Sequence, residues 1–67
     1  MYRVGDLVRF RSDLLLDCEY GGLIFFDDML PFVNKEVVIV EVDIDTEMFR
    51  VKDSKLWFSF EMINKRG

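Results

Sequence analysis

Short runs in which apolar and polar residues alternate predict β-strands along much of the chain. Residues 7–11 place two apolar side chains on one face and two arginines on the other, which is the period of a half-buried strand. Residues 48–52 repeat this pattern after a predicted turn at Asp45-Thr46, and residues 56–58 form a third run after a second turn. These runs predict a hairpin followed by one further strand.

The strongest strand signal is the β-branched run of residues 36–44. Its apolar residues occupy both phases of a strand, because Val37 and Ile39 share one face and the even-numbered residues share the other. Either the strand is buried on both sides, or a bulge near Glu41 switches its faces.

The alternation breaks down between Ser12 and Asn34, which predicts a long loop. This segment holds five acidic residues and no basic one, so the loop is acidic. Gly21-Gly22 supplies the positive φ that a tight reversal needs, and Asn34 suits a left-handed stop.

Two short helical turns are expected. Asp27 or Asp28 would cap the first, at residues 29–32, and Ser59 would cap the second, at residues 60–63. Together the elements predict an all-β fold, a small five-stranded barrel with a long acidic loop and short helical turns. The expected core consists of Val8, Phe10, Val37, Ile39, Val42, Phe49, Val51 and Trp57.

The chain has 67 residues and a formal net charge of −4, which fits a single domain over residues 1–67. Cys18 is its one cysteine and histidine is absent, so neither an internal disulfide nor a zinc site of nitrogen and sulfur ligands is available. Packing must therefore supply the stability, and Cys18 is expected to be a semi-buried free thiol. The apolar stretches are far shorter than the roughly 20 residues that span a bilayer, and no export signal is seen, so a cytoplasmic protein is expected.

An ordered set of short motifs extends through nearly the whole chain. The motifs are Val4-Gly5-Asp6 with Val8, Arg9-Phe10-Arg11, Tyr20-Gly21-Gly22, Met29, Asn34-Lys35, Val37, Ile39, Glu41-Val42, Trp57 to Ser59, and Glu61-Met62. In this order they resemble the SH3-like repeat of Mind bomb ubiquitin ligases and its small single-domain relatives in bacteria and phages. The family usually has glycine where Asn34 stands, and its aromatic cluster after Trp57 is one residue longer.

This resemblance implies that the barrel is SH3-like. In the large ligases such repeats resemble docking modules that hold peptide segments of a partner. The resemblance therefore implies a non-catalytic protein- or peptide-binding module of bacterial or phage origin.

The residues offer little basis for an enzyme. General acid–base catalysis near neutral pH usually employs histidine, which is absent, and neither the serines nor Cys18 has an evident base. Asp43-x-Asp45-x-Glu47 resembles the start of a calcium loop, but the glycine and the bidentate glutamate that complete such a loop are missing. A hairpin tip with solvated carboxylates is expected, and neither a metal nor another cofactor.

A weak nucleic-acid-binding face is the alternative function. Arg9, Arg11, Arg50 and Lys52 lie on neighbouring predicted strands and could contact phosphates. A net charge of −4 disfavours this interpretation. Outward charges that keep a sheet soluble and discourage edge pairing account for the same residues.

The number of aromatic residues is the most informative feature of the composition. Seven Phe, two Tyr and one Trp are more rings than a small barrel encloses, so an exposed aromatic patch beside the acidic loop is expected. The predicted partner-binding residues are Asp17, Glu19, Tyr20, Phe25, Phe26 and Trp57. Tyr20, Trp57 and one of the two phenylalanines should meet at the rim of the loop, whose acids favour a basic peptide. The alternative is that Trp57 fills the barrel and Tyr20 braces the loop. A monomer or weak homodimer without membrane contact is expected.

Overall fold

Within residues 2–64, which the computed structural model describes, the chain forms six short β-strands and two 3-10 helices. The elements are β1 (Leu7–Arg9), β2 (Glu19–Tyr20), β3 (Leu23–Ile24), η1 (Asp27–Phe32), β4 (Glu36–Asp43), β5 (Met48–Val51), β6 (Trp57–Ser59) and η2 (Phe60–Met62). The prediction of a small, mostly β domain with short helical turns is confirmed.

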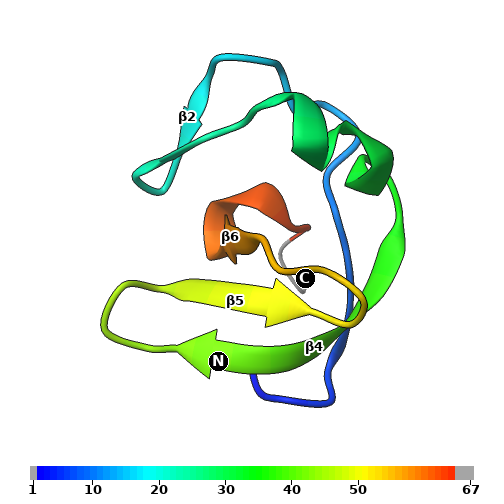
Figure 1. The fold of residues 1–67 in the computed structure, drawn as a ribbon, viewed down its shortest axis with the longest axis vertical. Coiled ribbons are helices and arrows are strands. Elements are labelled where there is room, and N and C mark those ends of the chain that lie inside the picture. Colours follow the sequence, from blue (N-terminus) through cyan, green and yellow to red (C-terminus); the bar gives the residue numbers. More distant parts are fainter. Residues whose placement is uncertain (1, 65–67) are drawn as a thin grey trace.

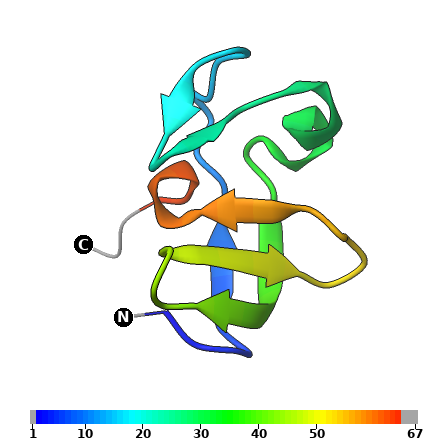
Figure 2. The same cartoon turned by 60° about the vertical axis from the view of Figure 1, so that its left-hand side comes forward.

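The strands form two antiparallel sheets. β1, β4, β5 and β6 make a four-stranded sheet in that order, while β2 and β3 make a separate hairpin. The β2–β3 hairpin and η1 lie at one end of the molecule and the four-stranded sheet at the other (Figure 1 and Figure 2). In Figure 2, η2 lies between the hairpin and the sheet.

β4 changes face at a bulge, as the sequence pattern allowed. Ile39 is paired with Val51, but the next pair is Glu41 with Arg50, so Val40 has no opposite residue. Ile39 is fully buried, whereas Val38 and Val40 are exposed. Before the bulge, the residues of β4 that face the core are the odd-numbered Val37 and Ile39. After the bulge, the even-numbered Val42 faces the core.

The two sheets are not joined into a closed barrel by strand pairing among the described residues. β1 meets the C-terminal segment at one isolated bridge, between Phe10 and Ile63. Two backbone hydrogen bonds flank it, from Arg11 N to Met62 O and from Asn64 N to Arg9 O, each at 2.9 Å. The segment after β1 and the segment after η2 are therefore joined by one isolated bridge and its flanking hydrogen bonds, without a continuous strand ladder.

The core is a cluster of phenylalanine rings with aliphatic residues around it. Phe10 and Phe58 are centred 4.7 Å apart in an edge-to-face arrangement, and Phe32 packs against both. Phe49 lies 5.8 Å from Phe58 and also contacts Phe10. Such ring pairs add to the free energy that burial of their apolar area contributes.

Five of the eight predicted core residues are confirmed as buried: Val8, Phe10, Ile39, Phe49 and Val51. Val37 and Val42 are partly buried against the same cluster. Trp57 as a core residue is wrong, because its side chain is 37% exposed. Successive residues of a strand point to opposite faces, and on β6 it is Phe58 that points inward.

The segment between Ser12 and Asn34 is more ordered than the predicted loop. It contains β2, β3 and η1, and it contributes Leu14, Phe25 and Met29 to the core. The predicted aspartate caps are wrong: η1 begins at Asp27 itself, and its N-cap residue Phe26 makes no side-chain capping bond.

The other local predictions are confirmed. Ser59 caps η2, since its Oγ accepts a hydrogen bond from Glu61 N at 3.2 Å. Asn34 adopts the left-handed conformation at φ 60°. Gly21 and Gly22 have φ values of 58° and 89°, which form the reversal between β2 and β3.

The packing of the core predicts that two phenylalanines differ sharply in their contribution to the free energy of unfolding. Replacing Phe58, which is fully buried, by alanine should lower the free energy of unfolding by about 3 to 5 kcal/mol. Phe26→Ala, at a position 39% exposed, is the matched control and should cost about 1 kcal/mol or less. Urea titrations followed by far-ultraviolet circular dichroism would measure both, and equal midpoints would contradict this core.

Candidate functional site

The β2–β3 hairpin divides the predicted binding residues between its two faces. Glu19 is paired with Ile24, and both are exposed. Phe26 continues this outer face by strand alternation and is exposed, and Asp17, in the turn before β2, is exposed as well. Asp17 has φ 65°, and its N donates to Phe25 O at 2.8 Å, which marks a bulge at the start of the hairpin.

Tyr20 and Phe25 lie on the inner face of the hairpin. Their rings are centred 6.4 Å apart in an edge-to-face arrangement, with Phe25 only 1% exposed and Tyr20 half-buried. The hydroxyl of Tyr20 accepts a hydrogen bond from Leu15 N at 2.9 Å. Tyr20 therefore braces the segment before β2, and of the expected aromatic trio the structure brings together Tyr20 and Phe25.

Arg11 connects the hairpin to η2. Its guanidinium donates to both carboxylate oxygens of Asp13, at 2.9 and 3.0 Å, and to Glu61 O at 3.0 Å. It also lies over the Tyr20 ring, 5.3 Å from the ring centre. Because the Arg11 guanidinium contacts Asp13, Glu61 O and the Tyr20 ring together, it holds Tyr20 beside η2.

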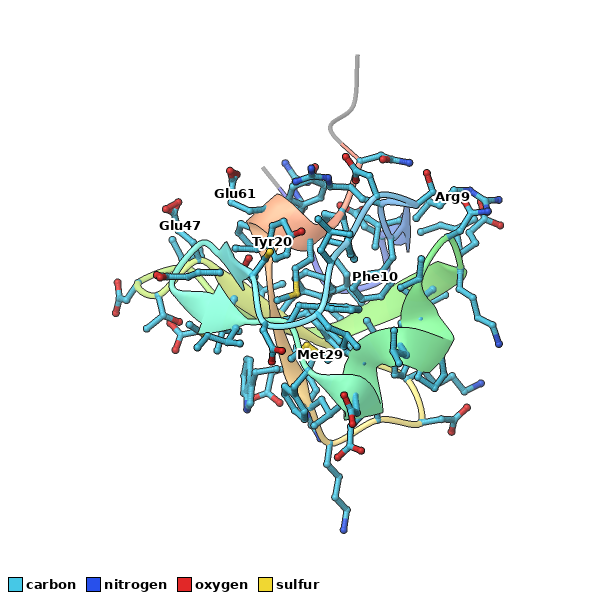
Figure 3. The ribbon with its side chains drawn as sticks, turned by 90° about the horizontal axis from the view of Figure 1, so that it is seen from above. Arg9, Phe10, Tyr20, Met29, Glu47 and Glu61 are labelled. Carbon is cyan, nitrogen blue, oxygen red and sulfur yellow. The ribbon has the colours of Figure 1, made fainter. Side chains whose placement is uncertain are left out.

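A groove runs beside η2, formed by two adjoining hollows. One is lined by Tyr2, Ile44, Glu47 and Phe60, and the other by Gly21, Thr46, Glu47, Ser59, Phe60 and Glu61. The hollows share Glu47 and Phe60, so they form one surface, which we call the η2 groove. Tyr20, Glu47 and Glu61 lie on the same side of the molecule, and Arg9 lies on the other (Figure 3).

Backbone contacts fix the walls of the η2 groove. Glu47 is held in the left-handed conformation at φ 56°, its N donating to Ile44 O and its O accepting from Phe60 N. A Cβ on Gly21 would lie 2.8 Å from Ser59 Oγ, so only glycine lets the hairpin turn sit this close to the end of β6. The ring of Phe60 is fixed by Tyr2 on one side, 5.1 Å away, and by Phe49, 5.7 Å away.

Trp57 lines a different hollow, on the outer face of the four-stranded sheet. The other residues that line it, Glu41, Val42, Asp43, Ile44 and Asp45, all belong to β4 and the turn after it. We call this surface the Trp57 hollow. The acids that line this hollow with Trp57 belong to β4 and the turn after it, and not to the acidic loop from which they were expected.

The sequence reasoning missed the residues of the η2 groove. Tyr2 and Phe60 belonged to the aromatic surplus, and Glu47 to the rejected calcium motif, so each carried a signal that pointed elsewhere. Their proximity depends on the meeting of three turns that are distant in sequence.

The basic face of the alternative function is largely neutralised by ion pairs. Arg50 Nη2 lies 2.8 Å from Glu41 Oε1, and Arg11 is engaged by Asp13. Arg9 donates to Asn34 O at 2.8 Å, and its guanidinium also lies 4.0 Å from Glu36. These arginines have local acceptors that would compete with phosphate.

Within residues 2–64, no group of three or more Asp, Glu, Cys or His side chains is arranged to hold a metal ion. Asp43 closes a turn instead, with Oδ1 accepting from Asp45 N at 3.1 Å and Thr46 N at 3.4 Å.

The prediction of a semi-buried Cys18 is wrong: Cys18 is exposed, because its backbone partner Phe25 fills the core there. In the same described part of the chain, no helix has the length and apolar character needed to span a membrane.

Comparison with known proteins gives no relative: no family model matches the chain, and no curated protein or solved structure matches it either. The resemblance to the Mind bomb-type SH3-like repeat stays a prediction from the sequence motifs.

The contact between Arg11 and Asp13 predicts a measurable titration. The hydrogen bonds that Arg11 donates, together with its charge, hold the pKa of Asp13 below the ordinary aspartate value. This contact therefore favours the fold above the ordinary aspartate pKa, and the effect is lost as the pH falls through the lowered pKa. In an NMR titration of the side-chain carboxyl, Arg11→Gln should raise the pKa of Asp13 toward the ordinary aspartate value. Arg9→Gln is the control and should leave it unchanged; an equal response to both substitutions would rule out the specific pair.

Proposed function

We propose that this protein is a non-catalytic peptide-binding module, and that the η2 groove is where it binds. The observation that supports this proposal is the lining of the groove. It combines the rings of Tyr2 and Phe60 with the carboxylates of Glu47 and Glu61, and among residues 2–64 no basic residue lines it. Aromatic rings with nearby acids suit a peptide that carries both apolar and basic side chains.

The partner that fits this groove is an extended basic peptide. Its apolar side chains would lie against Phe60, whose ring is fixed by two aromatic neighbours and so loses little freedom on binding. Its lysines or arginines would lie near Glu47 and Glu61. Because these acids are exposed, they would contribute more to selection of basic partners and to association rate than to affinity.

We also propose that the fold is a small SH3-like barrel. The support is the order of elements: one strand, a long segment with its own hairpin, three antiparallel strands, and a 3-10 turn. The bridge between Phe10 and Ile63 is placed where a fifth strand would close the sheet onto β1. Bacterial or phage origin, a cytoplasmic location, and a monomeric or weakly dimeric state belong to this proposal.

Binding to nucleic acid remains the rival proposal. Lys52 is exposed in the turn directly after β5, which carries Arg50, and Arg9 lies on β1 of the same sheet. The ion pairs of both arginines with Glu36 and Glu41 argue against it, since each phosphate contact would have to replace an existing partner. The two functions differ in their dependence on salt, because counterion release makes phosphate binding fall steeply with ionic strength.

A library of extended basic dodecapeptides, screened by fluorescence polarisation, tests the proposed function. We expect a peptide that binds the parent protein, and the double variant Glu47→Gln with Glu61→Gln should weaken it about three- to tenfold. The matched control is Glu36→Gln, which removes a carboxylate outside the groove and should have little effect. Absence of any peptide binding, or tight and salt-sensitive binding of an oligonucleotide, would overturn the proposal.

A further inference from the structure

The Trp57 hollow has the chemistry of a second subsite. We propose that it receives an arginine side chain of the bound peptide, next to the segment that occupies the η2 groove. This inference rests on the proposed function, which it deepens by naming a side chain and a place for it.

One cross-strand row on the outer face of the sheet contributes Trp57 and Glu41 to the hollow. β-Pairing sets Trp57 opposite Arg50, and Arg50 opposite Glu41, so an indole, a guanidinium and a carboxylate follow one another across three strands. Trp57 is 37% exposed, since the inward position on β6 belongs to Phe58. The indole is therefore partly accessible, in a hollow that residues of β4 also line.

The charges around Trp57 leave room for one more cation. Arg50 is paired with Glu41 at 2.8 Å, while Asp43 and Asp45 follow on β4 and the adjoining turn. Three carboxylates against one guanidinium give this face a formal charge of −2. In the described part of the chain, the Glu41–Arg50 contact is the one ion pair made by these three acids.

Arginine suits the Trp57 hollow better than any other side chain. A planar guanidinium can lie over an indole and donate in parallel to a carboxylate, whereas an ammonium does only the second well. The aliphatic stem of an arginine would contact Ile44, an exposed apolar residue of the lining. Neutral or acidic side chains would leave the acidic groups of the hollow uncompensated.

The Trp57 hollow and the η2 groove adjoin at Ile44. This side chain is 60% exposed and lines both of them, so a peptide that passes from the groove to the hollow would cross it. The molecule is 27 Å across at its widest. A fully extended peptide of about eight residues has this length, at about 3.3 Å a residue.

Trp57 is the only tryptophan of the chain, so its fluorescence reports the hollow directly. The probe is the octapeptide acetyl-(Arg-Ala)4-amide, compared with versions in which lysine or neutral citrulline replaces arginine. We expect a saturable change of Trp57 fluorescence with the arginine peptide, a weaker response to lysine and none to citrulline.

Two substitutions that each remove one negative charge test where the arginine side chain binds. Asp45→Asn should weaken the fluorescence-detected binding about three- to tenfold, because Asp45 lines the hollow. Asp53→Asn is the matched control, since Asp53 is an exposed aspartate in the turn after β5 and should leave binding unchanged.

The outcomes separate this inference from the function on which it rests. If peptides bind by polarisation and depend on Glu47 and Glu61 while Trp57 fluorescence does not change, the hollow is no subsite and the proposed function stands. If fluorescence responds and depends on Asp45, but the Glu47→Gln and Glu61→Gln double variant binds normally, the groove is wrong and the hollow stands. No saturable response to the arginine peptide at about millimolar concentration, or an equal response to citrulline, overturns the subsite.

Discussion

The packing of Phe58 between Phe10, Phe32 and Phe49 is the constraint on which both candidate binding surfaces depend. A domain of this size, whose one cysteine can form no internal disulfide, cannot expose this ring and remain folded. Once Phe58 points inward, Trp57 must point outward onto the sheet, and the chain turns at Ser59 so that Phe60 borders the η2 groove. Core packing and surface chemistry are thus determined by consecutive residues.

Local features of the fold were predictable because their causes are local. The alternation in β1 and β5, the change of phase in β4, the Ser59 cap and the left-handed Asn34 each depend on a few neighbouring residues. The β2–β3 hairpin escaped prediction because strands of two residues are too short to show a period. Burial of Phe25 and Met29 depends on contacts with distant strands, which no local pattern reports.

The chemistry of the candidate site was predicted better than its position. Acids beside an exposed aromatic were expected, and they occur, but around Trp57 the acids are those of β4 and its turn. The η2 groove joins Gly21, Glu47 and Phe60 from three turns, and their spacing along the chain carries no sign that they meet. The error over Trp57 has a simple cause: two adjacent aromatics compete for one inward position, and composition alone does not say which one takes it.

The contact between β1 and the C-terminal segment has a consequence for how the chain acquires its structure. Arg11 and Glu61 O are hydrogen-bonded across a separation of 50 residues, and the bridge from Phe10 to Ile63 lies beside them. Residues 10 to 63 must all be available before these partners can meet, so little of the core can form until this whole stretch has left the ribosome. Domains dominated by such distant pairings typically fold in milliseconds to seconds, and during that interval the rings that later form the core are exposed to other molecules.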